Sequence, residues 1–177
     1  MKREVNVWDY AGQILKAVGK GVLMTTAADG KVNTMTIGWG HLGTIWYKPV
    51  FIAYVRESRY TKALLEKNGE FTVNIPLAPA DQNIIGVCGT KSGRDMDKIQ
   101  ELGLTTESAD TVSVPGIKEL PLTLECKVIY KQDQDPGAID PDSLQRFYAP
   151  GSRNEGDYHT AYFGEITAAY ILEPINE

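Results

Sequence analysis

Residues Gly21–Trp39 read GVLMTTAADGKVNTMTIGW, and this segment gives the clearest indication of the fold class. The run from Gly21 to Thr26 is apolar and β-branched, which is typical of a strand. Asp29-Gly30 then predicts a tight turn, because both residue types tolerate a positive φ angle. The return strand is predicted from Val32 to Trp39. Strands joined by so short a turn run antiparallel, so the segment predicts a β-hairpin.

Further strands are predicted from alternating or continuous apolar residues at 50–55, 71–75, 122–130 and 159–172. Residues 40–49 are predicted as a loop, since they include Gly43 and Pro49. Residues 131–157 are rich in Asp, Pro, Gly and Ser, which predicts one long loop. The short strand connections favour a mainly β fold, an antiparallel barrel with short flanking helices, over a parallel sheet of β-α-β units.

Helices are predicted in four places. The first is residues 11–18, where Ala11, Ile14, Leu15 and Val18 share one apolar face and Gly19 is the stop. The others are residues 58–67, 79–88 and 95–102. Gly69 marks the end of the helix at 58–67, and Gly103 marks the end of the helix at 95–102. All are short, so we expect them to flank the sheet rather than to form a layer of their own.

Length and charge narrow the classes of partner. The chain has 177 residues, 42% hydrophobic and 23% charged, which suits one globular domain over residues 1–177. Its net charge is -5, and it has no run rich in Lys or Arg. Nucleic-acid surfaces and polybasic membrane segments need such runs, and the longest apolar run is too short to span a bilayer. We therefore expect no nucleic acid and no membrane partner.

The cysteines and histidines predict no metal site. Cys88 and Cys126 do not form a C-x-x-C pair, and with His41 and His159 they lack the spacing of zinc ligands. Two reduced thiols and no signal-peptide pattern are expected of a cytoplasmic protein. The glycine motifs of dinucleotide and P-loop sites and the G-x-S-x-G elbow of hydrolases are absent.

Four segments are candidates for a site, each with a simpler alternative. Asn33–Trp39 combines small residues with glycine, which lets a flat ligand approach the backbone; otherwise it is an ordinary edge strand. Arg56–Lys62 brings hydroxyls and cations to a predicted helix start, as an anion site needs; otherwise Ser58 only caps the helix. Cys88–Lys98 holds two glycines, hydroxyls and cations, or it only connects two helices. His159, before the last strand, is placed to contact a substrate, or it is structural.

Together these segments resemble the flavin reductase-like family, the FMN-binding split-barrel proteins that include flavoredoxin. The resemblance rests on six stretches in the same order, and it runs from about Gly21 to Leu172. They are NTMTIGW from Asn33, IWYKP from Ile45, RESRYT from Arg56, EFTVN from Glu70, CGTKSGRDMDK from Cys88 and HTAYFGEI from His159.

The resemblance implies an antiparallel split β-barrel, a homodimer and one FMN per subunit near the interface. Thr34 to Trp39 would border the isoalloxazine ring, Arg56, Ser58, Tyr60 and Thr61 would hold the phosphate end, and Thr90 to Lys98 would close the site. The cofactor-binding residues it implies are Asn33, Thr34, Met35, Thr36, Ile37, Trp39, Arg56, Ser58, Arg59, Tyr60, Thr61, Cys88, Gly89, Thr90, Ser92 and Lys98. His159 would contact nicotinamide, although the run Gly156-Asp157-Tyr158-His159 is one residue longer than the Gly-Asp-His of flavin reductases.

The function implied is an oxidoreductase that takes electrons from NADH or NADPH into FMN and passes them to a further acceptor. The alternative is a flavoredoxin-like electron-transfer or redox-sensing protein that receives its electrons from another protein. A binding module without FMN is a third interpretation. In each of the first two, the cofactor carries the redox chemistry and the protein orients it.

Overall fold

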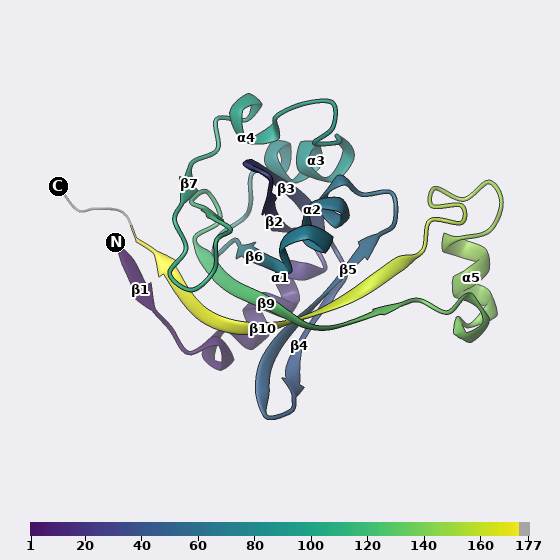
Figure 1. The fold of residues 1–177 in the computed structure, drawn as a ribbon, viewed down its shortest axis with the longest axis horizontal. Helices are drawn as coiled ribbons and strands as arrows, with labels where there is room; N and C mark the ends of the chain where they lie inside the picture. Colours follow the sequence, from purple (N-terminus) through teal and green to yellow (C-terminus); the bar gives the residue numbers. More distant parts are fainter. Residues whose placement is uncertain (174–177) are drawn as a thin grey trace.

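The computed structural model describes residues 1–173 (Figure 1). It contains ten strands, five α-helices and two 3-10 helices. Their order is β1 (Lys2–Glu4), η1 (Val7–Tyr10), α1 (Ala11–Val18), β2 (Val22–Ala28), β3 (Lys31–Ile37), β4 (Gly40–Ile45), β5 (Lys48–Arg56), α2 (Tyr60–Asn68), β6 (Glu70–Ile75), α3 (Gln82–Thr90), α4 (Lys98–Glu101), β7 (Thr106–Glu107), β8 (Gly116–Ile117), β9 (Leu122–Asp133), η2 (Pro136–Ala138), α5 (Pro141–Phe147) and β10 (His159–Leu172).

Eight strands form one sheet in the order β3-β2-β6-β9-β10-β5-β4, and β1 pairs with β10. Every strand pair in residues 1–173 is antiparallel, and within that range no ladder joins the two end strands, β3 and β4. The sheet therefore curls without closing. The prediction of a mainly β, antiparallel split barrel with short flanking helices is confirmed.

The prediction of a loop at residues 40–49 was wrong. Strand β4 forms a hairpin with β5, and the two-residue turn between them is Trp46-Tyr47. Both residues have positive φ, 50° and 60°, a conformation that glycine and asparagine adopt far more readily than aromatic residues. The usual sequence signal of such a turn was therefore missing.

The prediction of one long loop at residues 131–157 was also wrong. Strand β9 continues to Asp133, and the connection then holds η2 and α5 before β10 begins. Asp140 caps α5 by accepting hydrogen bonds from two backbone N–H groups, and Pro141 takes the first helical position. Figure 1 shows β9 and β10 running beyond the body of the barrel and carrying α5 on this projecting arm.

Three of the four predicted helices are present with shifted ends, and α1 matches its predicted bounds. Helix α2 begins at Tyr60 rather than Ser58, with no side-chain cap on Arg59, because Ser58 bonds elsewhere. It ends at Gly69, whose φ of 70° suits glycine. Helix α3 begins after Asp81, which caps it, and α4 is shortened to four residues because Asp97 caps its start.

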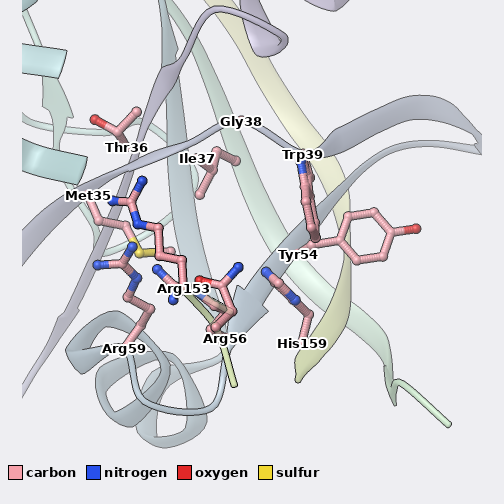
Figure 2. Close-up of a pocket in the computed structure, with 11 residues that line it drawn as sticks. Met35, Thr36, Ile37, Gly38, Trp39, Tyr54, Arg56, Arg59, Arg153 and His159 are labelled. Atoms are coloured by element: carbon pink, nitrogen blue, oxygen red, sulfur yellow. Dashed lines mark hydrogen bonds between the residues drawn. The ribbon is translucent and has the colours of Figure 1, made fainter. Parts of the chain in front are cut away.

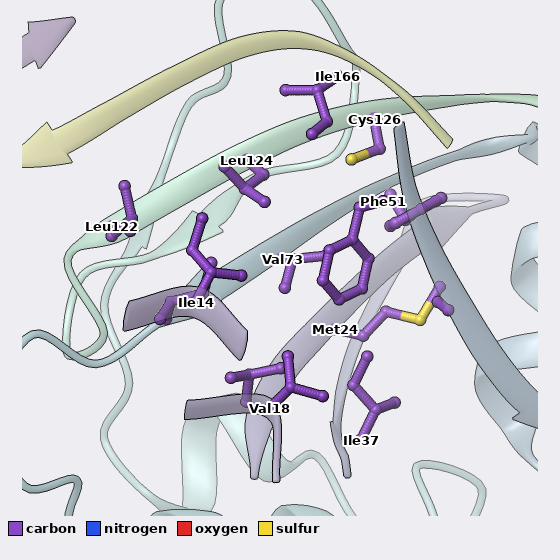
Figure 3. Packing of buried hydrophobic residues seen from close by; sticks show 14 of the residues in the cluster. Ile14, Val18, Met24, Ile37, Phe51, Val73, Leu122, Leu124, Cys126 and Ile166 are labelled. Carbon is purple, nitrogen blue, oxygen red and sulfur yellow. The ribbon is translucent and has the colours of Figure 1, made fainter. Parts of the chain in front are cut away.

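The main core lies between the curled sheet and α1 (Figure 3). Ile14 and Val18 of α1 pack there with strand residues such as Phe51, and Cys126 is among them. A second, smaller cluster lies between α3 and the segment before β9, and it contains Cys88. Both thiols are free and buried. None of the helices in residues 1–173 is both long and apolar enough to cross a lipid bilayer.

Candidate functional site

The site is built along β3, an end strand of the sheet that pairs only with β2. Its outer side faces α3 and α4, which contact it in place of another strand. Side chains also tie the strand to α2 and α3. The Asn33 amide donates to the hydroxyl of Thr61 in α2 at 2.8 Å, and the Thr36 hydroxyl donates to the carbonyl of Ile85 in α3 at 2.7 Å. The strand is therefore held at an edge where backbone groups remain available to a ligand.

Two adjacent pockets open along this strand. Pocket A, of about 270 Å³, is shown in Figure 2. Its walls are Met35–Trp39, Tyr54, Arg56, Arg59, Arg153, Asn154 and His159. Pocket B, of about 350 Å³, is lined by Asn33, Met35, Ser58–Thr61, Thr90–Asp95 and Lys98. Met35 and Arg59 line both, so the pockets are neighbours along one edge of the barrel.

Pocket B is positively charged in a chain whose net charge is negative. Arg59, Lys91, Arg94 and Lys98 line it, against one carboxylate, Asp95. Within residues 1–173, the buried Lys98 ammonium donates only to backbone carbonyls, those of Lys91 at 3.2 Å and Cys88 at 3.5 Å. Burial, with a smaller contribution from Arg59, lowers its pKa. A buried cation without a carboxylate partner, here Lys98, favours the binding of an anionic ligand.

Pocket A holds three arginines: Arg56, Arg59 and Arg153. Arg56 donates to the Asn154 side chain at 2.5 Å and lies 3.4 Å from the Asp157 carboxylate. Arg59 donates to the Gly89 carbonyl at 3.2 Å, and burial, followed by the neighbouring Arg56, lowers its pKa. Arg153 makes no hydrogen bond or ion pair within residues 1–173.

The register of β5 against β10 places Arg56 directly opposite His159. The His159 ring lies beside Trp39, with ring centroids 4.7 Å apart, and Phe147 of the arm packs edge-on against the same indole at 5.4 Å. Burial, then Arg56, lowers the pKa of His159 to about 4, so the imidazole is neutral at pH 7.

Hydrogen bonding assigns the His159 tautomer. The Gln134 side-chain oxygen accepts from the His159 backbone N–H at 2.9 Å, which fixes the orientation of that amide. The Tyr148 hydroxyl donates to the same oxygen at 3.0 Å. Its contact with His159 Nδ1 at 2.9 Å therefore requires Nδ1 to carry the proton. The Nε2 atom is left as an acceptor on the wall of pocket A, and no protein donor in the described residues reaches it.

The predicted hydroxyls of the 56–62 segment are already engaged. The Asp157 carboxylate accepts from the Ser58 backbone N–H at 2.9 Å and from its hydroxyl at 2.6 Å. Thr61 is buried and accepts from Asn33. Ser92 keeps a free hydroxyl proton, since its oxygen accepts from the Arg94 backbone N–H at 3.1 Å. The Ser58 hydroxyl is thus engaged, whereas Ser92 and Thr61 each keep a hydroxyl proton, and the half-buried Ser92 is more accessible in pocket B than the buried Thr61.

The predicted residues divide among three places. Met35, Thr36, Ile37, Trp39, Arg56, Arg59 and His159 line pocket A, and Asn33, Met35, Ser58, Arg59, Tyr60, Thr61, Thr90, Ser92 and Lys98 line pocket B. Thr34 is buried and bonded to Thr25 across the hairpin. The Cys88 side chain lies in the second core cluster, and Gly89 offers its carbonyl to Arg59.

Sequence reasoning missed several lining residues. Lys91 and Arg94 lie inside the 88–98 segment but were not selected from it. Tyr54 lies within a predicted strand, two residues before Arg56, and alternation along that strand was a usable signal. Arg153 and Asn154 lie in the 131–157 segment, and no local pattern connects them to Arg56, which is distant in sequence.

The open barrel with its edge pockets belongs to the class of split-barrel proteins. A family model described as the flavin reductase like domain matches residues 15–177, and the chain belongs to this family. Its fold is similar to flavoredoxin of Desulfovibrio vulgaris (Miyazaki F), with a TM-score of 0.66 at 24% identity over 86% of this chain and 69% of that one.

Two further proteins are similar to this chain. Flavoredoxin from Methanosarcina acetivorans is 27% identical, covers 86% of this chain and 68% of its own, and has a TM-score of 0.66. An uncharacterized protein of Archaeoglobus fulgidus is 34% identical over 100 residues, which is 56% of this chain and 55% of that protein. The matched part is thus about half the length of this curated relative.

Proposed function

We propose that the protein binds FMN across pockets A and B and functions as an NAD(P)H-dependent oxidoreductase. The observation that carries the proposal is the charge of pocket B, where four cations and one carboxylate lie beside the edge strand β3. The family to which the chain belongs is named for flavin. FMN joins a flat ring to a phosphate that is near-dianionic at neutral pH. Pocket B suits the phosphate, and the neighbouring backbone of β3 suits the ring.

The residues present fit this group. Lys98 and Arg94 supply charge, and Ser92 supplies a hydroxyl donor, which together match the needs of a phosphate. Residues 35–38 bring the edge of β3 to pocket A, and the small Thr36 and Gly38 let a planar ring approach the backbone there. When bound, FMN supplies hydride and electron transfer chemistry.

The chain's own residues would orient the reactants and hold protons. Neutral His159 offers Nε2 as a hydrogen-bond acceptor beside the exposed Trp39 indole, a position suited to the carboxamide N–H of nicotinamide. The arginines of pocket A would stabilise negative charge that develops on a ligand ring. The alternative function is a flavoredoxin-like carrier that receives electrons from a protein; the similarity to flavoredoxins favours it.

A homodimer is part of the proposal. The β4–β5 turn exposes Trp46 and Tyr47, with 61% and 102% of their surfaces accessible. Large exposed aromatics at one tip are typical of contact surfaces, and two-fold dimers are the commonest oligomers. We expect two copies to associate through this tip, each with its own FMN.

The test is the visible spectrum of the purified protein before and after FMN is added, followed by anaerobic addition of NADH or NADPH. Rapid bleaching of bound flavin supports the oxidoreductase, whereas bleaching only with a reduced protein donor supports the carrier. A colourless protein that neither quenches FMN fluorescence nor is stabilised by FMN would refute flavin binding altogether.

A further inference from the structure

The cations of the site form two groups, although FMN has only one phosphate. Of these two pockets, Lys91, Arg94 and Lys98 line B but not A, Arg56 and Arg153 line A but not B, and Arg59 lines both. Once pocket B holds the phosphate, the pair in pocket A has no phosphate of FMN as a partner. This argument rests on the proposed function.

Arg153 is the less compensated of the pair. Arg56 already has Asn154 and the Asp157 carboxylate as partners. Arg153 is exposed to solvent and has no hydrogen-bond or ion-pair partner within residues 1–173, and Figure 2 shows its side chain extending across the pocket toward β3. It is close enough to Arg59 to contribute to lowering the pKa of that guanidinium. Clustered guanidinium groups with so little counter-charge favour binding of an anion.

The rest of pocket A favours a small planar ligand. Trp39, 40% exposed, and His159 form an aromatic wall with an angle of 35° between their rings. Asp157 beside Arg56 shows that a carboxylate is compatible with this cluster.

We propose that Arg153, assisted by Arg56, forms a subsite for the carboxylate of a small planar organic acid, which is a second substrate of the FMN-loaded protein. The guanidinium fork matches a carboxylate in two parallel hydrogen bonds, and the Trp39–His159 wall contacts the face of the ring. The carboxylate of this substrate and the phosphate of FMN would then be bound by different cations.

The test uses benzoate and its neutral isostere benzamide as probes of the FMN-loaded protein. Binding is followed by the change in the flavin absorption spectrum and by calorimetry. We expect saturable benzoate binding and at least tenfold weaker benzamide binding. The Arg153→Met variant should weaken benzoate about ten- to a hundred-fold, the loss of one or more charge-assisted hydrogen bonds. Arg153→Lys should give an intermediate loss, because the charge remains without the fork.

The matched control is Arg146→Met, an exposed arginine of the same arm outside both pockets, which should leave benzoate binding unchanged. FMN affinity should change less than about threefold in Arg153→Met. Equal binding of benzoate and benzamide, or no loss in Arg153→Met, would overturn the subsite. So would a selective loss of FMN, or an Arg153-dependent preference for 2′,5′-ADP over benzoate, since either assigns Arg153 to a phosphate.

Failure of the two proposals can be told apart. If no FMN binds, the proposed function fails, and calorimetry of benzoate with the flavin-free protein still tests Arg153. If FMN binds and benzoate binding is independent of Arg153, only the subsite fails.

Discussion

The carboxylate of Asp157 accepts hydrogen bonds from both the backbone N–H and the hydroxyl of Ser58, at 2.9 and 2.6 Å. It thereby joins the β5–α2 turn to the segment before β10, far away in sequence. It also lies 3.4 Å from Arg56 and offsets part of the positive charge beside pocket A.

Replacing Asp157 by alanine should therefore have two effects. The free energy of unfolding should fall by about 1.5–3 kcal/mol, because hydrogen bonds from the Ser58 backbone N–H and hydroxyl to a charged carboxylate are lost. Affinity for anions in the pockets should rise, because a competing carboxylate is removed. Urea unfolding and FMN titration measure the two effects. Asp9→Ala, at an exposed aspartate, is the control and should change neither.

Lys98→Met should weaken FMN binding about ten- to a hundred-fold, since the buried ammonium is a principal cation of pocket B and methionine nearly matches its volume. Riboflavin has no phosphate, so its affinity should stay nearly constant. Fluorescence quenching measures both ligands. Ser58→Ala should have a smaller effect on FMN than Lys98→Met, because its hydroxyl is bonded to Asp157. Equal losses for FMN and riboflavin would place the phosphate elsewhere.

Stability should depend on pH through His159. Its pKa is lowered from 6.5 to about 4 in the folded protein, so the unfolded chain binds more protons between these values. The contribution of His159 to the free energy of unfolding is fully present above pH 6.5. It is lost as the pH falls toward 4, by up to about 3 kcal/mol. Urea unfolding of His159→Gln, which cannot titrate, should show less decline over this range. Parallel curves for the two proteins would contradict the assignment.

The double variant Trp46→Asn with Tyr47→Gly should change the stability of the protomer and the stability of the dimer in opposite directions. Asparagine and glycine suit positive φ, so the turn becomes less strained and each protomer gains about 1–2 kcal/mol. The exposed aromatics disappear at the same time, so the dimer should dissociate. Light scattering reports the mass, and urea unfolding at low concentration reports the stability. A dimer that persists would exclude this tip as the contact.

The sequence predicted features whose signals are local. Asp29-Gly30 identifies the first hairpin because turn geometry depends on two adjacent residues. The β4–β5 hairpin was hidden because Trp46-Tyr47 forms the same kind of turn without the expected residue types. Asp140-Pro141 was a readable helix start, overlooked because the segment around it is rich in Asp, Pro, Gly and Ser, as loops are.

Within the site, nonlocal pairing limited what could be predicted. The partnership of Arg56 with Asn154 depends on how β5 and β10 are registered, which no local pattern specifies. Cys88 was expected at the cofactor, yet its helical spacing from Ile84 and Ile85 places all three side chains in the second core cluster. The position of Cys88 on the buried face of α3 therefore determines where its side chain lies, and the motif around it did not indicate this.

Arg59 lines both pockets, and this makes the two ligands energetically dependent on each other. An anion in one pocket uses part of the same positive charge that attracts an anion to the other. The resulting coupling free energy is reciprocal: whatever factor one ligand imposes on the affinity of the second, the second imposes on the first. For the two proposed ligands, we therefore expect the shared side chain to make binding antagonistic, so that a tightly held second anion would favour release of the first.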